Sequence, residues 1–297
     1  MMLKVRPIFL IFLLGINLGY AQDYMFKVMA SKGDNRFKRA SQTDWKPVKI
    51  GISFNRGDKL MTSKDPYIGL LHSSGQTMEL LEQGTFEIEQ LASKVGIRKK
   101  GISAKYAEFV LNELENKDNN QLRVSIESRG LGEEIYLFLP LTAMILNPSL
   151  VIHWSQLRGG RTYVVSVKNM FGDPLIQLET NSNQLTLDLD QEELSTEKLL
   201  IISVSLKDDP SVVSNDIGLE RLTGDKVDAL KQEIAQLNEE IDSDSPLGQV
   251  ILASYYEDQD LLIDAIYHYQ EAIKLAPDVP DFETMYHAFL IRNNLHE

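Results

Sequence analysis

The sequence predicts a chain of several domains that combines β and α structure. Short runs of alternating apolar and polar residues, separated by turn residues, occur through residues 22–121 and again through 122–222. Through 223–297, apolar residues instead recur at steps of three and four, as on one face of a helix. We therefore expect a small antiparallel β-domain, a β-sandwich and a set of α-helical hairpins, in that order.

Residues 1–21 have the pattern of a secretory signal peptide. Lys4 and Arg6 precede an apolar run over residues 8–16, and Gly19-Tyr20-Ala21 places small residues where a signal peptidase reads them. The alternative is an uncleaved membrane anchor, but the run is shorter than the about 20 residues that span a bilayer. We expect cleavage after Ala21 and a mature protein in the periplasm, the outer envelope or the extracellular space, without a transmembrane segment.

Composition and charge limit the partners and the chemistry. The 297 residues include no cysteine, which excludes disulfides and thiolate metal sites. From Lys207 onward the chain has 6 Lys or Arg and 20 Asp or Glu, out of 30 and 43 in the whole chain. Because such a surface repels phosphates, we expect no nucleic-acid partner. The acidity fits either a solvated helical face or a docking face for a basic partner.

Six alternating runs predict the strands of the first domain. They are Tyr24–Ala30, Trp45–Gly51, Lys59–Thr62, Tyr67–His72, Thr77–Leu81 and Thr85–Leu91. Asn55-Arg56-Gly57-Asp58 is one of the turns between them, since glycine permits positive φ and Asn and Asp bond their own backbone. A helix should follow, with Ser103 as its N-cap.

The stretch WKPVKIGISFNRGDKLMTSKDPYIGLLHSSGQTMELLEQGTFEIEQL, residues 45–91, resembles the FecR-type periplasmic domain. The matching residues are Trp45, Gly57, Asp58, Thr62, Leu70, Leu71, Gly75, Leu80, Gly84 and Thr85. The resemblance implies a domain that receives a signal in the periplasm, as in the family's namesake, a regulator of a sigma factor. Such a regulator has a cytoplasmic domain and a membrane helix where this chain has a signal peptide.

Apolar residues alternate in four further runs within residues 122–222. They are Ile152 and Trp154, then Tyr163, Val165 and Val167, then Leu185, Leu187 and Leu189, and then Ile202, Val204 and Leu206. Strands spaced in this way over about 100 residues are typical of a β-sandwich. The stretch from Pro148 to Gly172 also resembles immunoglobulin-like and fibronectin type III modules. We expect Trp154 between the two sheets, and a ligand-stacking role is the alternative.

One stretch of the helical part, which begins at Pro246, resembles a tetratricopeptide repeat. The positions that carry the resemblance, and are expected to pack the two helices, are Leu252, Ala253, Tyr256, Ala265, Tyr269, Ala272 and the closing Pro277. Gln249 stands where the repeat has an aromatic residue. Since a single repeat cannot bury both of its faces, we expect amphipathic helices at 225–241 and 281–294 to close a four-helix unit.

The repeat resemblance also implies a binding face. It places Ser254, Glu257 and Asp258 on the exposed side of the first helix, which lines a peptide groove in that family. The groove would hold a protein or peptide partner of the cell envelope. The alternative is that the helical unit is only a structural cap.

No motif in the sequence indicates catalysis. Paired-histidine zinc spacing, the Gly-x-Ser-x-Gly elbow and phosphate-binding glycine loops are absent, and Ser195-x-x-Lys198 lacks any supporting motif. We expect no catalytic, cofactor-binding or metal-binding residues. The leading hypothesis is a non-enzymatic, exported interaction or scaffold protein of a Bacteroidetes-type envelope. The alternatives are a periplasmic sensor component acting through a membrane partner and, third, a wall-active hydrolase.

Overall fold

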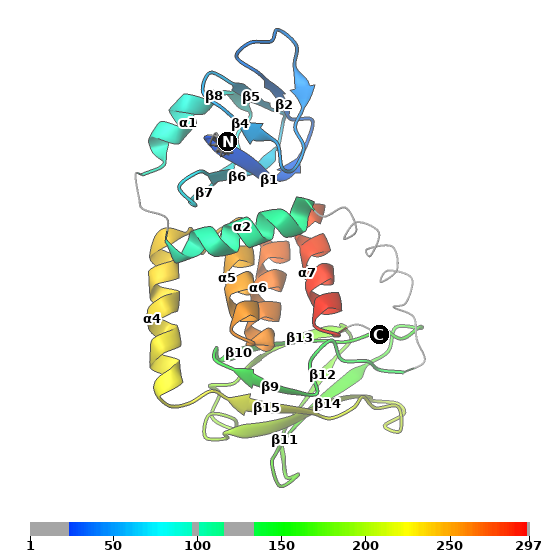
Figure 1. Ribbon diagram of the computed structural model, residues 1–297. Coiled ribbons are helices and arrows are strands. Elements are labelled where there is room, and N and C mark those ends of the chain that lie inside the picture. The colour runs from blue at the N-terminus through cyan, green and yellow to red at the C-terminus, as the bar shows by residue number, and fades with distance from the viewer. Residues whose placement is uncertain (1–23, 97–100, 116–133, 296–297) are drawn as a thin grey trace, which may run out of the picture.

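The computed structural model describes residues 24–96, 101–115 and 134–295. Figure 1 shows a mixed β and α protein, in which a layer of helices lies between two β-regions. The expected combination of antiparallel sheets with C-terminal helices is confirmed. The signal peptide and the boundary between residues 121 and 122 fall outside the described residues. Over the described ranges, no helix has the length and apolar character that crossing a membrane requires.

The first β-region consists of two four-stranded antiparallel sheets, ordered β4-β1-β6-β7 and β3-β2-β5-β8. Its elements are β1 (Phe26–Lys32), β2 (Arg36–Lys38), β3 (Lys46–Pro47), β4 (Ser53–Phe54), β5 (Lys59–Thr62), β6 (Tyr67–His72), β7 (Thr77–Leu80), β8 (Gly84–Glu87) and α1 (Ile88–Lys94). The sheets enclose a core of their own, centred on Phe26, Phe54, Leu60 and Ile68.

Two buried polar residues of the FecR-like stretch hold the turns of this region. Gly57 has a φ of 82°, which favours glycine, and the carboxylate of Asp58 accepts hydrogen bonds from the backbone N–H groups of Asn55 and Ala40. The Thr62 hydroxyl donates to the carbonyl of Glu82 and accepts from the N–H of Gly84. The Gly-Asp pair and the threonine therefore have a structural role here.

The last expected strand of this region, Thr85–Leu91, is wrong in its second half. β8 ends at Glu87, and α1 begins at Ile88, whose N–H donates to the carbonyl of Asp58. Ile88 and Leu91 are both buried, three residues apart on one side of the helix. Strand alternation and helical spacing therefore overlap at Ile88, and the helical pattern prevails beyond it.

The second β-region pairs a large sheet with a small one. The large sheet has the order β12-β11-β14-β15-β9, and the small one contains β10 and β13. The strands are β9 (Thr142–Ile145), β10 (Ser149–His153), β11 (Tyr163–Asn169), β12 (Pro174–Thr180), β13 (Gln184–Asp188), β14 (Leu199–Leu206) and β15 (Ile217–Arg221). All pairs are antiparallel except β15 with β9. Trp154 is fully buried in this region, 5.5 Å from the ring of Tyr163, which confirms its expected place in the core.

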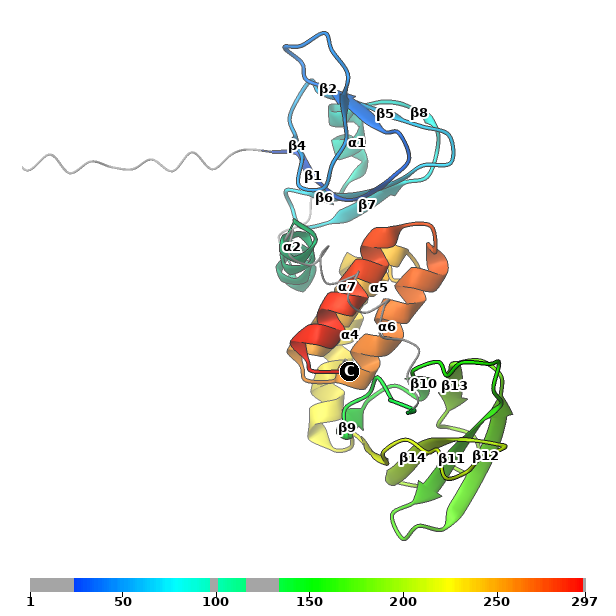
Figure 2. The ribbon, with the colours of Figure 1, turned by 90° about the vertical axis from the view of Figure 1, so that its right-hand side faces the viewer.

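In the described part of the chain, five helices form the layer between the β-regions. They are α2 (Ile102–Glu115), α4 (Asp225–Glu240), α5 (Pro246–Asp258), α6 (Leu262–Leu275) and α7 (Pro280–Arg292). Figures 1 and 2 show α2 lying across the ends of the others, on the side of the first β-region. Ser103 is not the N-cap of α2 but lies in its first turn, where its N–H donates to the Glu240 carboxylate of α4.

One continuous core joins the helices to the second β-region. It includes Trp154 of the second β-region, Ile266 of the helices and Tyr106 of α2. Tyr67 and Leu71 of β6, in the first β-region, also belong to this core. Because two strands cannot cover the inner face of a five-stranded sheet, α6 packs on β9 and β10 and fills the remaining space. The N-terminal turn of α6 is fixed there by Asp264, whose carboxylate accepts from the N–H groups of Leu146 (2.9 Å) and Asn147 (2.8 Å).

Candidate functional site

The repeat positions lie where α5, α6 and α7 meet. Leu252, Ala253, Tyr256, Ala265, Tyr269 and Ala272 are all buried, and Pro277 is in the turn between α6 and α7. The alanines leave room for α5 and α6 to approach closely. Tyr269 fills the space beside them and contacts Phe289 of α7 with ring centroids 5.0 Å apart. These residues form the packing seam of the helical layer.

Gln249 replaces an aromatic contact with polar ones. Its side-chain oxygen lies 2.7 Å from Nδ1 of His268, and its amide nitrogen donates to the carbonyl of Ser243. The His268 ring stacks on Tyr256, with centroids 4.9 Å apart. Burial lowers the pKa of His268 to about 4, so the imidazole is neutral at neutral pH. Gln249 therefore connects α5 to α6 through its hydrogen bond with His268.

Of the three α5 residues expected to line a groove, Ser254 is buried, Glu257 is partly buried and Asp258 is exposed. Ser254 is only 3% exposed, and its hydroxyl donates to the carbonyl of Val250, one turn earlier in the same helix. Asp258 accepts hydrogen bonds from Lys105 (2.8 Å) and Tyr106 (2.9 Å), both on α2. The bond from Lys105, followed by that from Tyr106, keeps the pKa of Asp258 below its usual value.

Glu257 is held by the end of α7. Its carboxylate accepts from Arg292 (2.9 and 3.1 Å) and from the side chain of Asn293 (2.9 Å). Arg292 also pairs with Glu113 of α2 and lies over the ring of Phe109. The open groove that the repeat resemblance implied is therefore not formed by Ser254, Glu257 and Asp258. Ser254 is buried, the carboxylate of Glu257 is bonded to α7, and that of Asp258 is bonded to α2.

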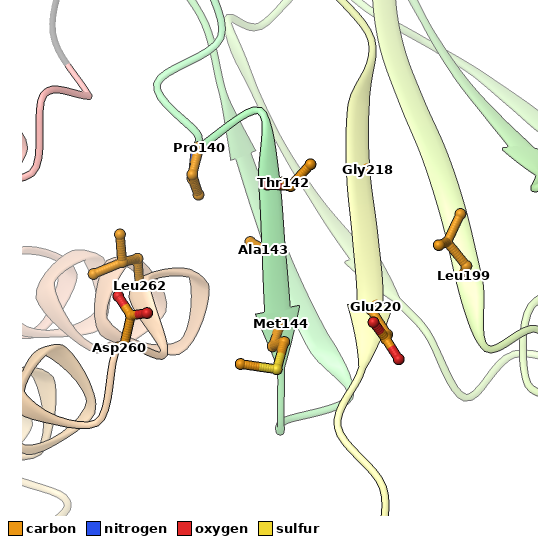
Figure 3. Close-up of a pocket in the computed structure, with 9 residues that line it drawn as sticks. All are labelled: Pro140, Thr142, Ala143, Met144, Leu199, Gly218, Glu220, Asp260 and Leu262. Carbon is orange, nitrogen blue, oxygen red and sulfur yellow. The ribbon is translucent and has the colours of Figure 1, made fainter.

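A surface pocket of about 370 Å³ lies instead beside β9 (Figure 3). Its lining is mostly apolar, with two acidic side chains, and comes from β9, β14, β15 and the start of α6. The residues are Pro140, Thr142, Ala143, Met144, Leu199, Gly218, Glu220, Asp260 and Leu262. Gly218 has no side chain to fill the space beside Thr142, so the sheet surface there stays hollow.

The pocket adjoins an open sheet edge. β9 is the last strand of its sheet in the described part of the chain. The carbonyls of Leu141 and Ile145 accept from β15 and the residue after it, so the backbone groups of Thr142 and Met144 point to the outer edge. Glu220 is paired with Lys198, whereas Asp260 has no ion pair among the described residues. The site can therefore accept an extended chain and a positive charge.

A second cavity, of about 650 Å³, lies between the small sheet and helices α6 and α7. Its lining includes His153, Gln184, Thr186, Gln270, Tyr286 and His287. Burial, and then the charge of His287, lowers the pKa of His153 to about 4, so this imidazole is also neutral at neutral pH. The cavity thus offers uncharged hydrogen-bonding groups beside three charged side chains, Glu271, Lys274 and Glu283. It lies at a junction between layers, a frequent place for small-ligand sites.

The described residues contain no group of three or more His, Asp or Glu side chains that could hold a metal ion. No protein-family model matches the chain, and no curated protein matches it. The residues of the Figure 3 pocket were not predicted as a site. They come from four elements that are distant in the sequence, and neither Gly218 nor Asp260 belongs to a motif.

Proposed function

We propose that the chain is an exported, non-enzymatic scaffold protein of the bacterial cell envelope that binds a protein or peptide partner. The observation that carries this proposal is the continuous core from α2 through the helices into the second β-region. Because this core also includes Tyr67 and Leu71 of the first β-region, it holds the two β-regions at a fixed distance. The helical layer then acts as a spacer with a fixed length.

The resemblances support the same setting. FecR-like, immunoglobulin-like and tetratricopeptide-repeat-like parts are typical of exported modular proteins, and their combination favours a Bacteroidetes-type envelope. Residues 1–21 supply the export signal in this proposal. Expression of the whole chain in such a bacterium, followed by fractionation and N-terminal sequencing, tests the setting. We expect a periplasmic or surface protein that begins at Gln22, and a cytoplasmic protein that keeps residues 1–21 would contradict it.

Partner binding is assigned to the pocket beside β9. An extended peptide would add to the edge of β9, and a basic side chain would reach Asp260. Asp260 has a φ of 59°, a conformation that Asn also tolerates, so Asp260→Asn removes the charge without strain. Asp244→Asn, in the exposed loop before α5, is the matched control.

These two point variants test binding more cleanly than a truncation would. Removal of the helices would uncover the shared core and unfold the second β-region, so loss of binding would have no clear meaning. In affinity isolation from the envelope fraction, we expect Asp260→Asn to weaken the partner's binding about tenfold, while Asp244→Asn leaves it unchanged. If both variants bind the partner equally well, the pocket beside β9 is not the binding site.

The cavity between the small sheet and α6–α7 favours a second candidate, a periplasmic sensor component that acts through a membrane partner. A ligand bound between two layers that share a core would change their packing. Because a ligand that binds only the folded state raises its stability, a thermal-shift screen of small neutral envelope compounds tests this role. The screen should include His287→Ala, which alters the lining. A shift that this variant abolishes would favour the sensor, and no shift would favour the scaffold.

A further inference from the structure

The hairpin between β11 and β12 ends in an apolar tip. Its two central turn residues are Met170, 60% exposed, and Phe171, 79% exposed. No other large hydrophobic side chain in the described residues is as exposed as Phe171. A single exposed apolar residue is common on protein surfaces, but two adjacent large ones at the most protruding positions of a hairpin require a reason.

The tip has a fixed shape. The side-chain oxygen of Asn169 accepts from the N–H groups of Phe171 (2.9 Å) and Asp173 (3.0 Å). The N–H of Gly172 donates to the carbonyl of Asn169, and Gly172 has a φ of 87°, which closes the turn back into β12. Met170 and Phe171 are therefore presented on a preformed loop, which reduces the entropy lost when a partner binds.

The fold itself gives no reason for these two residues. Asn169 and Gly172 supply the turn chemistry, while the central positions of such turns usually carry polar residues or proline. Met170 and Phe171 belong to neither hydrophobic core. Polar residues at both positions would form the same turn with less apolar surface exposed to water, so the apolar pair fits a binding role.

Two exposed glutamates lie at this end of the sheet, where Lys168 and Lys198 also lie. Asn169 pairs with Leu200, so the loop of residues 189–198, which leads into β14, lies at the same end as the tip. Arg221 fixes that loop by donating to the carbonyls of Leu194 and Glu197. The exposed Glu192 and Glu193 extend from it, and no ion pair in the described residues neutralises either one.

We propose that Met170 and Phe171 insert into an apolar pocket with a Lys- or Arg-rich rim on a protein partner. The apolar tip matches such a pocket, and Glu192 and Glu193 match its rim. An anionic membrane surface is the other surface an apolar tip could enter, but the two glutamates would be repelled by it. This inference deepens the proposed function, because it names the chemistry of a partner and a second contact outside the pocket beside β9.

Site-specific photo-cross-linking in the native host tests the tip. A benzophenone amino acid at position 171 should give one discrete adduct with an envelope protein. The same label at Leu81, which is 62% exposed in the first β-region, is the control and should not give that adduct. Mass spectrometry should place the cross-link on a partner peptide with apolar residues beside Lys or Arg. Absence of an adduct, the same adduct from Leu81, or an adduct of two copies of this chain would overturn the proposal.

Charge reversal tests the rim. Glu192→Lys with Glu193→Lys should lower the adduct yield about tenfold. Asp208→Lys with Asp216→Lys, both exposed toward the opposite end of the sheet, should leave the yield unchanged. If the adduct persists at full yield after reversal at 192 and 193, the partner has no basic rim and the proposal fails. Asp260→Asn in the β9 pocket should not change the cross-link position, which separates this test from that of the proposed function.

A vesicle assay tests the alternative that the tip binds a membrane surface. Vesicles of equal parts phosphatidylethanolamine and phosphatidylglycerol should not co-sediment with the mature protein. Phe171→Ser, at an exposed position that leaves the turn hydrogen bonds intact, is the comparison, and its circular dichroism should match that of the wild type. Co-sedimentation of the wild type that Phe171→Ser abolishes would identify a lipid surface as the occupant and overturn a protein partner.

Discussion

The two β-regions are joined to the helical layer in different ways. The first has a core of its own, and its polar links to the helices run mainly to helix starts: Glu79 accepts from the N–H of Leu247 in α5, and Ser31 donates to Asp281 of α7. The second has too few strands to close its own core, and α6 completes it. One sheet face of the first region also joins the shared core, through Met29, Tyr67 and Leu71, and Tyr67 contacts Phe282 of α7 with ring centroids 5.7 Å apart. The second β-region therefore depends on the helices for its core, whereas the first region has a separate core and adds only one face to the shared one.

The largest effect should come from a buried residue of the shared core. Ile266→Ala in α6 removes apolar volume from a fully buried position and should lower the free energy of unfolding by about 3–4 kcal/mol. Because the core is shared, the loss should also lower the unfolding midpoint reported by Trp154. The chain has only two tryptophans, so Trp45→Phe leaves Trp154 as the sole reporter.

The matched variant for that comparison is Leu60→Ala, a fully buried change in the core of the first β-region. In a Trp154→Phe background, Leu60→Ala should lower the unfolding midpoint reported by Trp45. In a Trp45→Phe background, it should leave the unfolding midpoint reported by Trp154 unchanged. Two results would contradict this comparison. One is that Ile266→Ala changes only the helical circular dichroism signal, and the other is that Leu60→Ala lowers the midpoint reported by Trp154 as much as Ile266→Ala does.

A smaller, pH-dependent effect should come from Asp264, which links α6 to the second β-region. Burial raises the pKa of Asp264 from its ordinary value of 3.8 to about 6. The folded state then binds the proton more tightly than the unfolded state, so the contribution of this group to stability is greatest below about pH 4 and falls as the pH rises to 6. The size of this change is about 3 kcal/mol.

Asp264→Ala cannot titrate and leaves the N–H groups of Leu146 and Asn147 without their acceptor. Urea unfolding of both proteins at pH 4, 5, 6 and 7 should therefore show the largest advantage of the wild type at pH 4, with the difference shrinking towards pH 7. A difference that grows with pH would mean that Asp264 is ionised at lower pH than its burial implies.

The smallest effect should come from the junction with the first β-region. Glu79→Gln keeps an oxygen that can accept from Leu247 but removes a negative charge at the N-terminus of α5, which should cost about 0.5–1 kcal/mol. Faster hydrogen exchange at the Leu247 amide, with the Trp154 midpoint unchanged, is the expected result. If Glu79→Gln lowered the free energy of unfolding as much as Ile266→Ala does, the first β-region would be coupled to the helices as strongly as the second.

Local patterns predicted some elements well, although the expected strand Trp45–Gly51 is a strand only at Lys46–Pro47. The strands Lys59–Thr62 and Tyr67–His72 have the bounds that alternation and turn residues indicated, and α5 begins at Pro246, capped by Ser245. The first and last residues of these elements depend on the chemistry of neighbouring residues, which can be read from the sequence.

Contacts between distant segments were not predictable in the same way. Nothing in the sequence of α2 indicated that Tyr106 would bond Asp258, and nothing in the sequence of α5 indicated that Ser254 would be buried. A helix face that is exposed in a repeat has the same residue spacing as a face that a distant helix covers. The sequence of one helix therefore does not distinguish the two cases. The parallel pairing of β9 with β15, which helps to form the pocket in Figure 3, likewise depends on tertiary packing.

The position of α2 limits how this chain could grow by gene duplication. In an ordinary repeat array, each new copy is covered by the next, so units can be added one at a time. Here the cover of α5 is encoded about 140 residues upstream of it. A tandem copy of α5 and α6 alone would expose tyrosines that α2 now packs against, such as Tyr255, 5.5 Å from the ring of Tyr106. A single helical pair is therefore the stable end point for this architecture.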